Sequence, residues 1–353
     1  MTVFYAGLHF LVDGLCALAM FGIFLPGGRG IYPMLIYNFC AFALQMPMGV
    51  LLDALNEKEK GGRKKNFALF AAAAGVVCTV AGLAAGPAVL GTGNALFHVG
   101  GGVGTIQEDN EKNWKGRGLG VFVAPGALGL YLGTLAAKQG FQRAGIPGVI
   151  AGMLLLGAAA VYVSRKGRKN KGRQECHGSE GPKPAGAGTV RLALCCLAVV
   201  FLRSYIGMEV TFSWKNDMTA GLLAVLAIVG GKVAGGFLAA RHGAMKTAVF
   251  SLVPASLCYF CCTVMPLGLA ALFFFNMTMP VTLYQMARRL PAYPGFAFGF
   301  LTFALFLGFL PGYFQALPWA PGNVTGGVGC AVSLILMAWG ICGTGRKAGG
   351  RPI

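Results

Sequence analysis

Charged residues are scarce in this chain. Asp, Glu, Lys and Arg together make up 11% of its 353 residues, and hydrophobic residues make up 56%, whereas soluble domains average about 25% charged and about 45–50% apolar residues. A soluble chain of this length needs a polar surface that this composition does not provide. The composition therefore excludes an ordinary soluble enzyme, and it predicts an all-α polytopic membrane protein.

Several sequence motifs are also absent. No Gly-rich segment is followed by Gly-Lys-Ser/Thr, the loop that holds ATP phosphates, so a primary pump is not expected. The first segment has neither a basic n-region nor a small-residue cleavage site, so we expect a retained helix and not a signal peptide. The eleven cysteines are scattered, and the CxxC spacing of Cys258 and Cys261 has no second Cys/His pair beside it. We therefore expect no cofactor and no metal site.

Long apolar runs recur along nearly the whole chain. A helix needs about 20 apolar residues to cross a hydrocarbon core of about 30 Å, and twelve runs approach this length. The predicted spans form two sets of six. They are 3–24, 31–53, 66–86, 88–106, 118–138 and 146–163, then 190–212, 218–240, 246–264, 266–287, 295–316 and 324–343.

The placement of basic residues predicts the domain organisation and the orientation. The net charge is +18, but the basic residues lie in short gaps between apolar runs and form no nucleic-acid-binding face. We expect two six-helix bundles, 1–163 and 190–344, joined by a basic loop at 164–189 and followed by a tail at 345–353. Because Lys and Arg concentrate in the loops after even-numbered spans and in this tail, both termini are expected in the cytoplasm. The opposite loops hold four basic residues, which are Arg29, Lys138, Arg143 and Lys215.

The two halves correspond to each other in sequence. Gly49 matches Gly236, Asn94 matches Asn276, and Gly118 matches Gly295, at separations of 187, 182 and 177 residues. Near-constant separations close to half the chain length predict a duplicated bundle.

Both matched glycines begin a recurring motif. Gly49-Val50-Leu51-Leu52-Asp53 is followed by Gly62-Arg63-Lys64, and the second copy keeps Gly236, Leu238, Arg241 and Gly243 but has Ala240 in place of the acidic residue. This pattern resembles the Gly-x-Leu-x-Asp-Arg-x-Gly-Arg-Lys signature of the major facilitator superfamily. The resemblance implies a cytoplasmic gate in which Asp53 contacts basic residues or a helix N-terminus, and a simple topological anchor is the competing interpretation. The implied gate residues are Gly49, Asp53, Gly62, Arg63, Gly236 and Arg241.

Two further segments resemble exporters of that superfamily. Ala124-Pro125-Gly126, with Gly120 and Gly129 on either side, is similar to the Gly-x-x-x-Gly-Pro-x-x-Gly pattern of its antiporters. The segment from Gly91 to His98 is similar to the matching segment of fosmidomycin-resistance-type exporters, although Val99 and Gly100 replace the Pro and Glu found there. The resemblance implies export.

A few ionisable side chains fall inside predicted spans, where a charge costs about 2.5–3.5 kcal/mol on insertion scales. His9 and Asp13 stand at positions i and i+4, so their side chains are expected to share one helix face. Asp13 is the first candidate for proton coupling, followed by His9 and by His98 in the fourth span. The alternatives are a local Asp–His hydrogen bond that only stabilises the helix, and a core His98 satisfied by a carbonyl group.

Other polar side chains inside spans are candidates for substrate contact. Arg203 can attract an anionic substrate or neutralise Asp13, and Lys232 either lines a cavity or extends its amine to the interface. The complete set of predicted substrate contacts is Asn94, His98, Arg203, Lys232 and Asn276.

The sequence therefore predicts a secondary active transporter, a monomer in the inner or plasma membrane. It would move a small organic molecule by alternating access with protons as the coupling ion. A facilitator, or a sensor or scaffold that kept this fold without transport, is the first alternative. A membrane-embedded enzyme is the second, and it would need clustered carboxylates or metal ligands at one depth.

Overall fold

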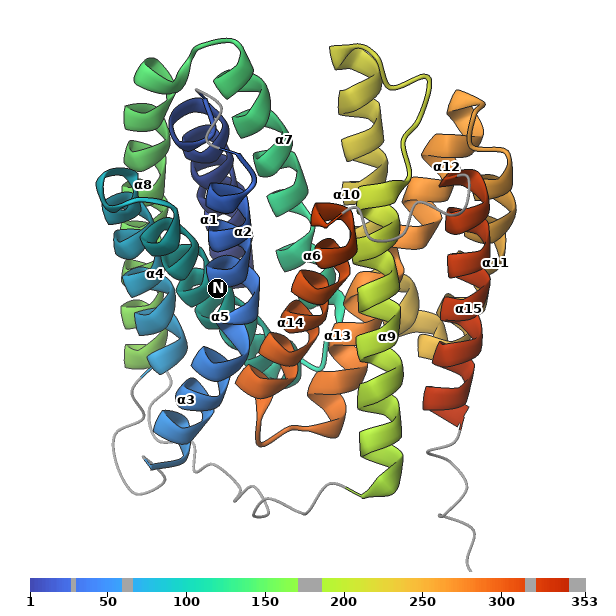
Figure 1. Ribbon diagram of the computed structural model, residues 1–353. Helices are drawn as coiled ribbons and strands as arrows, with labels where there is room; N and C mark the ends of the chain where they lie inside the picture. The colour runs from blue at the N-terminus through green and yellow to red at the C-terminus, as the bar shows by residue number, and fades with distance from the viewer. Residues whose placement is uncertain (27–29, 59–65, 171–185, 315–321, 343–353) are drawn as a thin grey trace, which may run out of the picture. The chain divides into compact units, whose positions relative to one another are not determined.

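The structure, a computed structural model, describes residues 1–26, 30–58, 66–170, 186–314 and 322–342, and within these ranges every regular element is a helix (Figure 1). The first half contains α1 Thr2–Ala19, η1 Met20–Phe24, α2 Tyr32–Asn38, η2 Phe39–Ala43, α3 Gln45–Lys58, α4 Phe67–Ala85, α5 Pro87–Glu111, α6 Arg117–Val123, α7 Pro125–Lys138 and α8 Gln142–Asn170. The second half contains α9 Ala187–Glu209, α10 Met218–His242, α11 Ala244–Phe260, α12 Met265–Asn276, α13 Thr278–Arg289, α14 Pro294–Tyr313 and α15 Gly322–Cys342.

These helices confirm the predicted all-α class with twelve spans. Among the described residues, ten helical segments are long and apolar enough to cross a membrane, and the shorter apolar helix α11 and the 25-residue Gly-rich helix α5 complete the set. The predicted and observed ends agree within a few residues, as for the span predicted at 218–240, which is the helix Met218–His242.

The polarity of the surface fits a lipid environment. Phe70, Val77 and Leu155 are 69–73% exposed on the flanks of their helices. In contrast, His9 and Arg203 are buried. Because a soluble protein rarely exposes so much apolar surface, the helices are expected to face hydrocarbon with their flanks.

The described chain divides into two compact units. Unit 1 comprises Met1–Asn113, Val121–Lys183 and Ala292–Gly299, and unit 2 comprises Trp114–Gly120, Pro184–Pro291 and Phe300–Ile353. The first turns of α14 therefore belong to unit 1 and the rest of that helix to unit 2. The first turn of α6 belongs to unit 2 and its end to unit 1. The predicted central loop 164–189 and the tail 345–353 lie largely outside the described residues.

Glycines bring α4 and α5 unusually close together in unit 1. A Cβ atom at Gly75 or Gly82 on α4 would meet the backbone of Phe97 or Leu90 on α5, well inside van der Waals contact. Gly93 and Gly100 on α5 face the backbone of α4 in the same way. The seven-residue spacing on each helix places both glycines of a pair on one face. This contact fixes α5, which carries Asn94 and His98.

Candidate functional site

The centre of the candidate site is on α1. The Nε2 atom of His9 lies 3.1 Å from Oδ2 of Asp13, one helical turn away. The His9 side chain is 7% exposed and that of Asp13 is 20% exposed. This arrangement confirms the predicted shared face.

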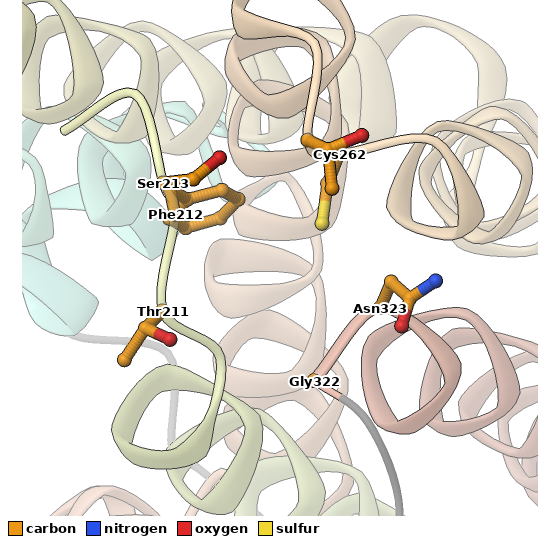
Figure 2. Close-up of a pocket in the computed structure, with 7 residues that line it drawn as sticks. Thr211, Phe212, Ser213, Cys262, Gly322 and Asn323 are labelled. Carbon is orange, nitrogen blue, oxygen red and sulfur yellow. The ribbon is translucent and has the colours of Figure 1, made fainter.

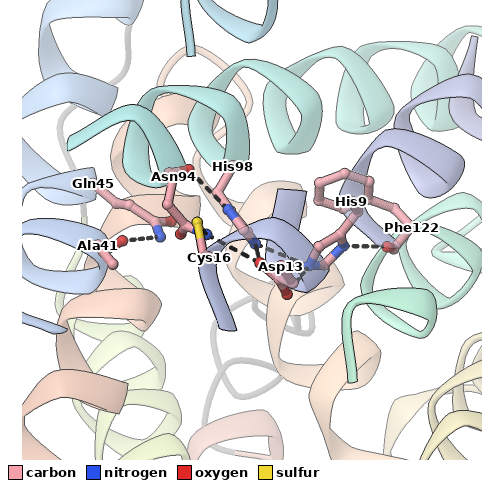
Figure 3. A network of polar contacts seen from close by, with 8 residues as sticks. All are labelled: His9, Asp13, Cys16, Ala41, Gln45, Asn94, His98 and Phe122. Carbon is pink, nitrogen blue, oxygen red and sulfur yellow. Dashed lines mark hydrogen bonds and ion pairs between the residues drawn. The ribbon is translucent and has the colours of Figure 1, made fainter. Parts of the chain in front are cut away.

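The helix α5 adds a second imidazole to this pair. The Nε2 atom of His98 lies 2.9 Å from Nε2 of His9 and 3.5 Å from Oδ1 of Asp13. The structure thus brings together all three residues that the sequence proposed for proton coupling (Figure 3). We call His9, Asp13 and His98 the triad.

The outer nitrogen of each imidazole faces a backbone carbonyl group. His9 Nδ1 lies 2.7 Å from the carbonyl oxygen of Phe122, and His98 Nδ1 lies 2.9 Å from that of Asn94. A carbonyl oxygen can only accept a hydrogen bond, so each Nδ1 atom carries the proton. In the neutral imidazoles both Nε2 atoms are then acceptors, and the carboxylate of Asp13 is a third. Three acceptors at this separation require one shared cation between them.

Neighbouring side chains orient the carboxylate. The amide nitrogen of Asn94 donates a hydrogen bond to Oδ1 of Asp13 at 3.0 Å, and it also lies 3.6 Å from the sulfur of Cys16. Asn94, which the sequence assigned to substrate binding, therefore holds a triad residue.

Glycines of α7 pack directly against the triad and against the backbone of α1. A Cβ atom at Gly126 would lie against Nε2 of His9 and Oδ2 of Asp13, and Gly129 and Gly133 contact the backbone of α1 equally closely. The motif Ala124-Pro125-Gly126 thus supplies space directly beside the triad.

Sequence reasoning missed Gln45 and Cys16. Gln45 is fully buried and donates from Nε2 to the carbonyl oxygen of Ala41 at 2.6 Å, while its Oε1 atom has no hydrogen-bond partner among the described residues. The available signal was the position of Gln45 in the middle of the span 31–53. For Cys16, the signal was its place three residues after Asp13, on the same face of the helix.

The predicted gate residues lie apart from the triad. The carboxylate of Asp53 accepts hydrogen bonds from the backbone N–H groups of Gly295 at 2.8 Å and Phe296 at 2.7 Å, so it caps the first turn of α14. Gly49 packs directly on the backbone of Gly295. Of the two contacts that the resemblance implied for Asp53, the structure therefore shows the helix N-terminus. Gly62 and Arg63 lie outside the described residues.

The second copy of the motif makes a matching glycine contact in unit 2. Gly236 on α10 meets the backbone of Gly116 and Gly120 at the start of α6, and Arg241 is exposed at the end of α10. Ala240 leaves this contact without a capping carboxylate.

The remaining predicted substrate contacts also belong to unit 2. Arg203 on α9 is 8% exposed, and its Nη1 atom has no hydrogen-bond partner among the described residues. Lys232 on α10 is partly buried. Asn276 donates from its amide to the carbonyl oxygen of Leu272, one turn earlier in α12, at 2.8 Å. A buried, unsatisfied guanidinium is the feature of this unit that most resembles a site for an anionic group.

Unit 2 also has a pocket of about 330 Å³ beside the loop that follows α9 (Figure 2). No charged side chain and no predicted site residue lines it, and the hydrogen bond from Trp214 to the carbonyl oxygen of Cys262 lies next to it. Its lining consists of Thr211, Phe212, Ser213, Cys262, Thr263, Gly322 and Asn323.

Apolar helix flanks and buried ionisable groups define a polytopic α-helical membrane protein. Its fold is that of major facilitator superfamily transporters. FucP in the outward conformation matches with a TM-score of 0.61 at 10% identity, over 96% of this chain and 98% of that one. A variant of the Escherichia coli fucose:proton symporter FucP matches with a TM-score of 0.62 at 12% identity, over 96% of each chain.

A third solved structure of this fold is a bacterial homologue of the iron transporter ferroportin in the outward-facing state. It matches with a TM-score of 0.60 at 15% identity, over 98% of this chain and 99% of that one. No family model and no curated protein sequence matches the chain. At these identities the likeness describes the fold.

Proposed function

We propose that this protein is a secondary active transporter that moves a small organic molecule by alternating access, with protons as the coupling ion. The observation that carries the proposal is the triad, because two buried imidazoles and a half-buried carboxylate on two spanning helices lie close enough to share one proton. The fold supports the transport function, since the similar solved structures are transporters and one is a fucose:proton symporter.

The substrate contacts in this proposal come from both halves of the chain. Asn94 and His98 offer hydrogen bonds beside the triad, and Arg203, Lys232 and Asn276 supply positive charge and an amide on α9, α10 and α12. The direction is export, on the resemblance of the segments around Gly126 and His98 to exporters. The protein acts as a monomer in the inner or plasma membrane, with both termini in the cytoplasm and no enzymatic activity or nucleic-acid partner.

The first test is proton flux in liposomes that contain a pH-sensitive dye. Cationic, neutral and anionic compounds are screened for substrate-dependent flux under an imposed proton gradient. We expect one class of compound to drive flux in the wild type and Asp13→Asn to abolish it, because the amide cannot exchange the shared proton.

Asp217→Asn is the matched control for this experiment. Asp217 is exposed and caps α10 by accepting from the N–H group of Ala220 at 2.7 Å, a bond that Asn also makes. Flux should survive in this variant. Flux that persists in Asp13→Asn would contradict coupling at the triad, and a wild type that moves no compound at all would favour the scaffold alternative.

A further inference from the structure

The triad presents three metal-ligand atoms to one point. The two Nε2 atoms are 2.9 Å apart, that of His9 lies 3.1 Å from Oδ2 of Asp13, and that of His98 lies 3.5 Å from Oδ1. With one ligand atom taken from each residue, all three lie within 4.8 Å of one another. We infer that the triad binds a divalent first-row transition-metal ion, of the class of Zn²⁺, Fe²⁺ and Co²⁺, through His9, Asp13 and His98.

The separations match the edges of a coordination polyhedron. Metal–nitrogen and metal–oxygen bonds are about 2.0–2.2 Å long at such sites. Two ligands at that distance are about 3.0 Å apart when they subtend 90° and about 3.4 Å apart when they subtend 109°. The observed range of 2.9–3.5 Å covers both cases. The three side chains can therefore ligate one ion with small rotations of their rings.

The surroundings of the triad have the features of a metal site. Metal-ligating histidines almost always donate their other ring N–H to a carbonyl or carboxylate group. Both imidazoles do so here, to the carbonyl oxygens of Phe122 and Asn94, which leaves each Nε2 lone pair directed at the centre. The Asn94 amide holds the carboxylate of Asp13. Once the shared proton has left, both neutral imidazoles and the carboxylate are in the form that a metal ion requires.

The ligand set selects the class of metal. Two imidazoles and one carboxylate suit Zn²⁺, Fe²⁺ and Co²⁺, whereas Mg²⁺ and Ca²⁺ prefer oxygen ligands. The remaining coordination positions are left for water or a small ligand. Gly126 leaves the space next to Nε2 of His9 and Oδ2 of Asp13 without a side chain.

The sequence predicted no metal site because it contains no ligand motif. His9 and His98 are 89 residues apart, so neither belongs to the short spacings that identify zinc sites. Only the packing of α1 against α5 forms the site.

Metal binding at the triad also bears on the cargo. This step rests on the alternating access and proton coupling of the proposed function, and it replaces the small organic molecule by a divalent metal ion. A proton and a metal ion compete for the same three acceptors, so a divalent ion enters the triad as the shared proton leaves it. Alternating access would then exchange metal ions for protons across the membrane.

The test of the binding site is a titration of the purified, detergent-solubilised protein with Co²⁺, followed by its visible d–d absorption. We expect one Co²⁺ ion per chain with nitrogen and oxygen ligation, displaced by Zn²⁺ and unaffected by Mg²⁺ or Ca²⁺. Asp13→Asn and His98→Gln should each weaken binding at least tenfold. His242→Gln, which removes an exposed histidine outside the triad, should leave binding unchanged.

A second variant protects this test against misfolding. Gly126→Ala keeps all three ligands but fills the space beside them, so it should also lose Co²⁺ while the protein remains monodisperse. Wild-type protein should melt at a higher temperature with Zn²⁺ present, since a ligand of the folded state stabilises it. If the triad variants are poorly folded, this metal-dependent shift in the wild type and its loss in Gly126→Ala still decide the question.

Three results would overturn the inference. They are no Co²⁺ spectrum in the wild type, a spectrum that survives in Asp13→Asn/His98→Gln, and an intense thiolate charge-transfer band that assigns the ion to cysteines. Binding does not depend on transport. A Co²⁺ spectrum without any flux in liposomes would refute the proposed function alone, whereas proton flux that requires Asp13 without a Co²⁺ spectrum would refute the metal site alone.

Discussion

At the scale of single residues, carboxylates in unit 1 are held by donors from distant parts of the sequence. Glu108 at the end of α5 accepts from the backbone N–H of Thr2 at 2.6 Å and from the Thr2 hydroxyl group at 2.8 Å. The first turn of α1 has no capping side chain of its own. Glu108 therefore caps α1 from another helix, and it joins the two helices that carry the triad.

We predict that Glu108→Gln lowers the free energy of unfolding by about 1.5–3 kcal/mol at neutral pH, the usual contribution of hydrogen bonds to a charged group. The measurement is thermal unfolding in detergent. Glu111→Gln, which removes an exposed carboxylate from the same helix, is the control and should change little. Equal losses in both variants would show that charge at the end of α5 matters and that the cap does not.

The same cap predicts a dependence on pH. Glu108 lies beyond the predicted span 88–106. Burial by itself raises its pKa, but hydrogen bonds from Lys112, from Thr2 and from the N-terminal ammonium outweigh burial and lower the pKa from 4.5 to about 2. A lowered folded-state pKa stabilises the protein above the unfolded value of 4.5, and this stabilisation is lost as the pH falls from 4.5 towards 2. The difference between wild type and Glu108→Gln should shrink over that range.

The triad shows what single-residue reasoning can and cannot supply. The shared face of His9 and Asp13 follows from helical periodicity alone, and the sequence predicted it correctly. The position of His98 beside His9 and Asp13 depends on the rotation and the register of α5 against α1, which the helical period does not determine. For the same reason, the buried Gln45 was missed although its sequence position was known.

At the scale of helices, glycine determines which pairs of helices come closest. We predict that Gly93→Ala destabilises the protein by about 1–3 kcal/mol, because the new methyl group would meet the backbone of Thr79 on α4. Gly157→Ala on α8 is the control, since a Cβ atom there has nothing within 4 Å. It should be neutral or stabilising by about 0.5–1 kcal/mol, because Ala favours the helix more than Gly does.

Thermal unfolding of the two glycine variants, side by side in the same detergent, measures this difference. The Gly93 variant should also lose triad function, because its helix carries Asn94 and His98. If Gly93→Ala and Gly157→Ala unfold alike, the close approach of α4 and α5 is not required.

The two copies of the signature motif use the same contact between helices but not the same cap. Gly49 packs on the first turn of α14, and Gly236 packs on the first turn of α6. Only the first copy has a carboxylate, Asp53, to accept the N–H groups of the helix that it meets. The repeat was visible in the sequence, and so was the replacement of the acidic residue by Ala240. The structure shows the physical consequence: one of the two helix N-termini lacks the carboxylate that favours its dipole.

At the scale of the whole molecule, the sequence predicted the spans well because length and hydropathy define them. It did not predict where the spans are interrupted. Breaks lie just before Pro47, at Pro125 and just before Pro280, where the missing N–H group prevents the helical hydrogen bond. Three other prolines, Pro147, Pro254 and Pro311, stand inside continuous helices. Whether a proline interrupts a helix therefore depends on its neighbours, which sequence periodicity does not identify.

The orientation in the membrane is the last prediction, and it concerns the complete set of spans. The segment Arg117–Lys138 has 22 residues, or about 33 Å at 1.5 Å per residue, so the turns at its two ends must lie on opposite sides of the bilayer. The turn before it belongs to the side rich in Lys and Arg, and we expect that side to be cytoplasmic.

Alkaline phosphatase, which is active only outside the cytoplasm, should therefore be inactive when inserted at Asn113 and active at Gln139. A fluorescent protein, which matures in the cytoplasm, should give the opposite result at the same two sites. Reversed activities at both positions would place the termini outside, and activity of the same reporter at both would mean that α6 and α7 do not form one span.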